Sequence, residues 1–196
     1  MTFVETVPEQ DASGAVAEIY ESDREVWGRL PNFTQAFSQA PEVYKRWRLL
    51  NGAIKESMEL RRYELATVAA ARRLRSSYCT LAHGSVLMDR FFDAGEVQSI
   101  VSDFHAAGLS DEDVAVMELA EKVVDDATTV SEADFDRLRA HGLPDSEIVG
   151  VVLAAAARCF FSKTLDALGV RPDASYRALA PELLATLTVG RPVAES

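Results

Sequence analysis

The sequence has 196 residues, of which 48% are hydrophobic and 26% charged, and its formal net charge is −11 at pH 7. This length predicts one domain, residues 1–196, large enough to bury a core without disulfides or a structural metal. Nucleic acids and anionic membranes repel an acidic protein, so the charge argues against either one as a partner.

Cysteine usage and the N-terminal sequence bear on the cellular compartment. The two cysteines, Cys79 and Cys159, do not make a secreted disulfide framework, and the first residues lack the basic region and apolar run of a signal peptide. The longest apolar run, Ile148 to Ala157, is shorter than the roughly 20 residues of a membrane helix. These features predict a soluble, cytoplasmic protein without a membrane partner.

The charges are unevenly distributed along the chain. Residues 103–136 carry eleven carboxylates against the single Lys122, whereas residues 45–75 carry nine basic side chains. The two blocks could attract each other between neighbouring subunits, or they could be solvated helix faces.

Apolar residues recur at helical spacing and no stretch alternates with period two, so the predicted fold class is all-α. A first helix ends at residues 30–32, because proline disfavours helix at the residue before it. A second helix opens at Pro41. Four of its apolar residues are spaced as one buried stripe, namely Val43, Trp47, Leu50 and Ile54.

The next helix is expected over residues 59–74, where an alanine-rich stretch allows close packing. Ser76 or Ser77 can cap the following helix, which runs through Leu87 before an interruption at residues 93–95. Ser110 and Ser131 each precede an acidic residue by three positions, which is typical of a capping box and predicts two further helix starts.

A long apolar helix should begin at Asp145 or Ser146 and close at Gly169, which suits a left-handed C-cap. A last helix is expected to carry four apolar residues, namely Tyr176, Leu179, Leu183 and Leu187. The tail from Arg191 has no evident packing partner, and we expect it to fray.

Cys79 and His83 are the strongest chemical lead, because they are four residues apart and share one helix face. A cysteine reacts as its thiolate, which the first turn of a helix and a neighbouring imidazole both favour. The alternative is a small core cysteine beside a hydrogen-bonded histidine.

The residues around this pair resemble the alkylhydroperoxidase D (AhpD) and carboxymuconolactone decarboxylase family. The thiol branch of that family has a glutamate, eleven residues, and then Cys-x-x-Cys-x-x-x-His. Here Glu64 is followed, after eleven residues, by Ser76, Cys79 and His83 in the same register. The resemblance spans about residues 30–172, and within the family the chain is similar to the peroxidase-related subgroup. It implies an AhpD-like, oligomeric helical fold.

The resemblance also implies roles for these residues. Cys79 matches the peroxidatic cysteine, which becomes a sulfenic acid, and His83 with Glu64 matches the proton relay. Ser76 stands where the family has its resolving cysteine, so this motif cannot form its own disulfide. An external thiol could reduce the sulfenic acid, Cys159 could resolve it from a distance, or the site could have left peroxide chemistry.

We therefore predict an AhpD-like thiol oxidoreductase that reduces small-molecule hydroperoxides with an external thiol reductant. One alternative is a decarboxylase or isomerase of the same superfamily, in which His83 and Glu64 act as acid and base on a carboxylated substrate. Another is a non-catalytic, redox-sensing oligomer. We predict no cofactor and no metal, because zinc sites usually gather more Cys or His than this set offers. The resemblance implies a homo-oligomer.

Overall fold

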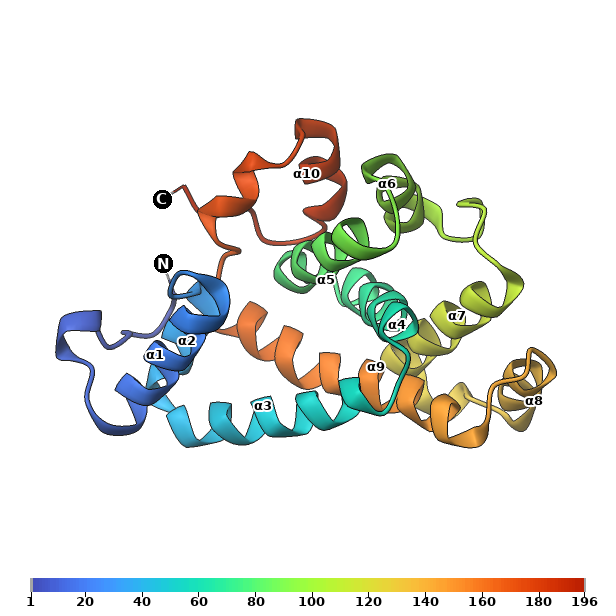
Figure 1. Ribbon diagram of the computed structural model, residues 1–196, viewed down its shortest axis with the longest axis horizontal. Coiled ribbons are helices and arrows are strands. Elements are labelled where there is room, and N and C mark those ends of the chain that lie inside the picture. Colours follow the sequence, from blue (N-terminus) through green and yellow to red (C-terminus); the bar gives the residue numbers. More distant parts are fainter. Residues whose placement is uncertain (1, 196) are drawn as a thin grey trace.

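The computed structural model describes residues 2–195, and these residues form ten α-helices and no strand (Figure 1). The all-α prediction is therefore confirmed. The helices are α1 (Gly14–Trp27), α2 (Asn32–Ala36), α3 (Pro41–Glu56), α4 (Leu60–Arg73), α5 (Ser77–Arg90), α6 (Ala94–Asp103), α7 (Asp111–Asp126), α8 (Glu132–Ala140), α9 (Asp145–Ala167) and α10 (Pro181–Leu187).

Helix α4 lies at the centre of the molecule, packed against α5, α7 and α9 (Figure 1). Every residue from Tyr63 to Ala71 is buried, because the alanines bring the neighbouring backbones close on all sides. Helices α3 and α9 run side by side along one edge, with α1 and α2 at the end of α3. This arrangement places α3, α4, α5 and α9 around a common space.

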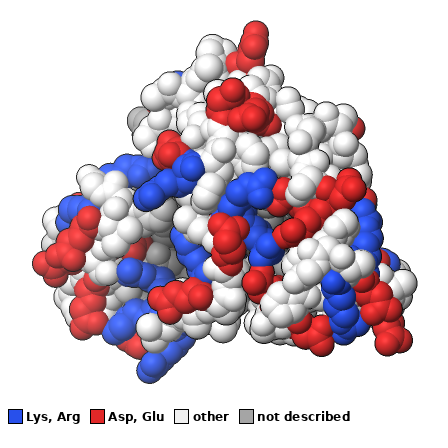
Figure 2. All heavy atoms as spheres, turned by 45° about the vertical axis from the view of Figure 1, so that its right-hand side comes forward, with Lys and Arg blue, Asp and Glu red and all other residues white. Residues whose placement is uncertain are grey.

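The acidic and basic blocks of the sequence pair with each other inside one chain. Four arginines of α4 form ion pairs with four carboxylates of α7: Arg61 with Asp113, Arg62 with Glu112, Arg72 with Glu121, and Arg73 with Asp125. Basic and acidic side chains accordingly lie beside each other on the face shown in Figure 2. These residues therefore pair within one chain, whereas the sequence suggested either attraction between subunits or solvated helix faces.

The stripe predicted for the helix from Pro41 is only half buried. Trp47 and Ile54 are in the core, but Val43 and Leu50 are 50% and 56% exposed, and the buried neighbour is Tyr44 instead. Large apolar side chains also point outward from α9. Together these two helices expose Val43, Leu49, Leu50, Val149, Leu153 and Phe160. An apolar surface of this kind is typical of a protein–protein contact.

Several helix boundaries follow the predicted capping residues. Ser76 is the N-cap of α5, the Ser110 hydroxyl accepts the Asp113 backbone N–H, and Gly169 is left-handed at the end of α9. The interruption predicted at residues 93–95 is instead a helix start, since Asp93 and Glu96 form a capping box at the beginning of α6. The predicted last helix also splits, with residues 174–178 forming a 3₁₀ turn before α10.

The C-terminal tail packs on the body instead of fraying. Val193 and Ala194 are each 5% exposed, and the Ala194 backbone N–H donates to the Pro172 carbonyl at 2.9 Å. The Gly190 backbone N–H donates to the Ser77 hydroxyl at 2.7 Å. A Cβ at Gly190 would lie 1.9 Å from the Arg75 carbonyl oxygen, so only glycine fits there.

Helix α9 has the length and apolar composition of a membrane span, with 56% of that window buried inside the structure. Its packing against α3, α4 and α7 gives it the position of a soluble protein's core helix. The sequence analysis underestimated the apolar length of this helix, because Arg158 and Lys163 interrupt its apolar run.

Candidate active site

Glu64 and His83 meet between the two helices that carry them. Glu64 lies on α4 with 1% of its surface exposed, and its Oε2 is 2.5 Å from His83 Nδ1 on α5. The small residues that follow Glu64 let the helices approach closely enough for this contact. The contact between Glu64 and His83 that the resemblance implies is thus present in the structure.

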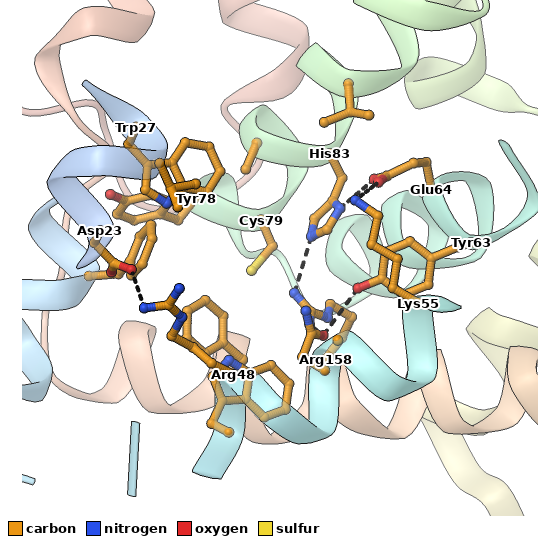
Figure 3. A pocket seen from close by; sticks show the side chains of 18 of the residues that line it. Asp23, Trp27, Arg48, Lys55, Tyr63, Glu64, Tyr78, Cys79, His83 and Arg158 are labelled. Atoms are coloured by element: carbon orange, nitrogen blue, oxygen red, sulfur yellow. Dashed lines mark hydrogen bonds and ion pairs between the residues drawn. The ribbon is translucent and has the colours of Figure 1, made fainter. Parts of the chain in front are cut away.

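Cys79 is the third residue of α5, in the first turn of the helix. Its side chain points into the same space as the His83 imidazole (Figure 3). The Ser162 hydroxyl of α9 donates to Cys79 Sγ at 3.1 Å. The sulfur therefore accepts a hydrogen bond from α9 at the N-terminal end of α5.

The residue that the sequence analysis missed is Arg158, on α9. Its Nη1 donates to His83 Nε2 at 3.1 Å and its Nη2 donates to Asn51 Oδ1 at 2.6 Å. Arg158 is 3% exposed, and its guanidinium carbon lies 5.2 Å from the centre of the Trp47 ring. One signal was available, since an arginine inside an apolar core helix is rare unless it has a specific partner.

These contacts fix the protonation of His83. Because Arg158 has only donors, His83 Nε2 must be the acceptor, so Nδ1 carries the proton and donates to Glu64. Burial lowers the pKa of His83, and the charges of Arg158 and Lys55 lower it further, against the opposing effect of Glu64. The imidazole is therefore neutral at pH 7.

Glu64 remains a carboxylate in this arrangement. Burial alone would raise its pKa, but the contacts with His83 and Lys55 outweigh burial and hold the pKa below its usual value. Lys55 Nζ lies 3.5 Å from Glu64 Oε1. The site is thus an ionised glutamate, a neutral histidine and a cationic arginine in series.

Glu64, Cys79, His83 and Arg158 all line one cavity of about 280 Å³. Its walls are largely aromatic, with Trp27, Phe33, Tyr44, Trp47, Tyr78 and Phe161 contributing rings. This volume is close to the lower end of the roughly 300–1,000 Å³ typical of ligand pockets. The cavity can hold a small, mainly apolar molecule next to the Cys79 sulfur.

Ser76 and Cys159 do not line this cavity. Ser76 is completely buried at the N-cap of α5, and Cys159 is a free, partly exposed cysteine on α9. Cys159 is partly exposed because α9 turns that side of its surface outward. Among residues 2–195, no group of three or more His, Cys, Asp or Glu side chains could hold a metal ion.

No family model and no curated protein sequence matches the chain. Solved structures match it closely in shape. The AhpD core of a peroxidase-related protein from Ralstonia eutropha JMP134 superposes with a TM-score of 0.80 at 18% identity, covering 97% of this chain and 98% of that one. A peroxidase-related protein from Silicibacter sp. TM1040 gives 0.76 at 19% identity, covering 90% and 91%. The fold is therefore that of the AhpD-like proteins.

A third similar structure carries a different activity. The debrominase Bmp8, solved as a cysteine-to-alanine variant in complex with 2,3,4-tribromopyrrole, superposes with a TM-score of 0.75 at 14% identity. The alignment covers 95% of this chain and 98% of that one. The AhpD-like fold thus serves more than one chemistry, and the function of this chain has to be argued from its site.

Proposed function

We propose that this protein is a thiol oxidoreductase that reduces hydroperoxides at Cys79. The observation that supports this function best is the position of the Cys79 sulfur. It opens on an apolar cavity in the first turn of a helix, with a hydroxyl donor at 3.1 Å and the Glu64–His83 pair on the same wall. A nucleophile, a base and a residue that orients the base are the parts that covalent catalysis needs.

The proposed first step is attack of the Cys79 sulfur on the peroxide O–O bond. An S–O bond forms, the O–O bond breaks, and the thiol proton ends on the departing alkoxide, giving a sulfenic acid and an alcohol. His83 can carry this proton on Nε2 once the Arg158 hydrogen bond to that nitrogen is released. Glu64 then stabilises the imidazolium that forms.

The second half of the cycle needs an external reductant. One small thiol condenses with the sulfenic acid to give a mixed disulfide and water, and a second thiol displaces Cys79 and leaves as a disulfide. Ser76 has no thiol, and Cys159 is outside the cavity. These positions favour a small external thiol over a resolving cysteine within the chain.

The experiment is to trap sulfenic acid after treating the reduced Cys159→Ser protein with hydrogen peroxide or cumene hydroperoxide. We expect labelling at Cys79 much faster than that of a model peptide, and faster with the apolar peroxide because the cavity is aromatic. The Cys79→Ser/Cys159→Ser double variant should show no labelling. A rate equal to that of the peptide would contradict the proposal.

An acid–base enzyme acting on a carboxylated substrate is a second candidate, because the Glu64–His83–Arg158 series is complete without the thiol. Full turnover of such a substrate by Cys79→Ser would support it. Rapid sulfenylation without sustained turnover under any thiol donor would instead indicate a redox sensor.

We further propose a cytoplasmic homo-oligomer. The exposed apolar side chains of α3 and α9 support contacts between copies of the chain. Light scattering of the wild type and of Leu153→Glu tests this, since a charge at that position should lower the mass of the particle if copies meet there.

A further inference from the structure

Arg158 is a buried cation without a carboxylate partner. Only 3% of it is exposed, and among residues 2–195 its guanidinium bonds to two neutral groups, His83 Nε2 and Asn51 Oδ1. Its Nε is buried and has no hydrogen-bond acceptor. Burying a charge without an opposite charge beside it is unfavourable, so the position suits an anion.

The other charged groups of the cavity do not supply this anion, because they pair with each other. Asp23 Oδ1 accepts from Arg48 at 2.9 Å, and Glu64 lies between His83 and Lys55. The cavity is lined by three cations, two carboxylates and a neutral histidine. One positive charge is left over in a protein whose formal net charge is −11.

The uncompensated charge faces the ligand space. Arg158 and Asn51 both line the cavity, and Figure 3 shows Arg158 and Cys79 on the walls of this same space. The side-chain N–H groups of Asn51 donate to no group among residues 2–195, because its oxygen is the atom that accepts from Tyr63 and Arg158. Asn51 therefore has unused donors beside the cavity that Arg158 also lines.

We propose that the cavity binds a small, apolar organic acid whose carboxylate pairs with Arg158. One leftover positive charge matches a carboxylate better than a dianionic phosphate, which would leave a negative charge buried. The planar guanidinium suits the two carboxylate oxygens, and the aromatic walls suit an apolar or aromatic body. If the proposed function holds, the substrate class is hydroperoxides of small organic acids. The anion site itself does not depend on that chemistry.

The test is a calorimetric titration of the reduced wild-type protein with benzoate and with its neutral isostere, benzamide. We expect benzoate to bind about tenfold more tightly or better, as a charge-assisted hydrogen bond to a buried arginine would give. Equal affinities, or no binding of benzoate, would overturn the proposal without any variant being needed.

Two variants locate the preference. Arg158→Gln should abolish the preference for benzoate, whereas Arg46→Gln, which removes the same charge from an exposed position on α3, should leave it unchanged. Circular dichroism checks that both variants are folded. A preference that survives in folded Arg158→Gln would overturn the assignment.

The Cys79→Ser variant separates this inference from the proposed function. It should bind benzoate like the wild type although it cannot react with peroxide. Slow sulfenylation of the wild type together with tight benzoate binding would contradict the peroxidase function and support the anion site.

Discussion

Arg158 Nη1 donates to His83 Nε2 at 3.1 Å, so an arginine 75 residues further along the chain occupies the nitrogen on which a general base would act. The other imidazole nitrogen, His83 Nδ1, donates to Glu64 Oε2 at 2.5 Å. The imidazole is therefore fully engaged in the absence of a ligand. An anion that attracts the guanidinium would weaken this contact and free Nε2, which couples binding to proton transfer.

Replacing Arg158 by glutamine should raise the pKa of His83. Burial is the largest cause of its lowered pKa and the Arg158 charge adds to it, while the opposing effect of Glu64 stays in the variant. The C2 proton of His83, followed by NMR against pH, measures the shift. The resonances of His105 and His141 serve as internal controls, and an unchanged or lowered His83 pKa would contradict the assigned contact.

The lowered pKa of His83 also predicts how stability depends on pH. Below the ordinary value of 6.5 the unfolded chain takes up a proton at this position that the folded chain still excludes. The His83 contribution to stability is complete above pH 6.5, falls as the pH drops towards the folded-state pKa, and is constant below it. The free energy of unfolding, measured with urea at a series of pH values, should fall more steeply with decreasing pH in that window for the wild type than for His83→Gln. The same pH dependence in both proteins would exclude a neutral His83.

Replacing Ser162 by alanine should slow sulfenylation of Cys79 several-fold at neutral pH. The variant removes the hydroxyl that donates to the Cys79 sulfur at 3.1 Å, and a hydrogen bond worth about 1 kcal/mol during the attack corresponds to a several-fold change in rate. Thr164→Ala is the matched control, because that hydroxyl of α9 bonds to the Phe160 carbonyl instead. Equal slowing in both variants would indicate a general effect on the helix.

Introducing a cysteine by Ser76→Cys in the Cys159→Ser background should create a peroxide-driven disulfide with Cys79. Ser76 is the N-cap of α5 and Cys79 the third helical residue, so the substitution creates the spacing of a Cys-x-x-Cys motif at the start of a helix. The sulfenic acid and the new thiol would condense with loss of water. Thiol titration and intact mass measure the product, and a persistent sulfenic acid would show that the two side chains do not meet.

The ion pairs between α4 and α7 should contribute unequally to stability. Arg61 binds both oxygens of Asp113, which is 3% exposed, so Arg61→Ala leaves a buried carboxylate and should cost about 2 kcal/mol. Arg73→Ala breaks an exposed pair with Asp125 and should cost under about 1 kcal/mol. Urea denaturation compares the two, and equal losses would contradict this ranking.

The helices and the Cys79–His83 pair could be predicted because both depend on local spacing, whereas Glu64 was found through the resemblance to a family motif. Capping residues such as Ser110 likewise lie next to the backbone they bond. Arg158 could not be placed in this way. Its partners on α5 and α3 lie 75 and 107 residues away in the sequence, and only the tertiary fold brings them together.

Surface features were predicted less well for the same reason. Val43 and Ile54 share a spacing, but which of them is buried depends on where α9 crosses α3. The tail from Arg191 carries no periodic pattern, yet its backbone bonds to Pro172 and its Arg191 side chain to the Asp166 carbonyl. Such contacts use single backbone groups, which leave no signature in side-chain composition.

The hydrogen bond from Gly190 to Ser77 joins residues 113 positions apart, across the turn that leads into the helix of Cys79. Arg75 in that turn has a left-handed backbone with φ of 57°, a strained conformation for a residue with a side chain. During translation Cys79 leaves the ribosome well before Gly190 is added. The hydrogen bond that joins the C-terminal tail to the start of α5 therefore forms only after most of the chain has been made.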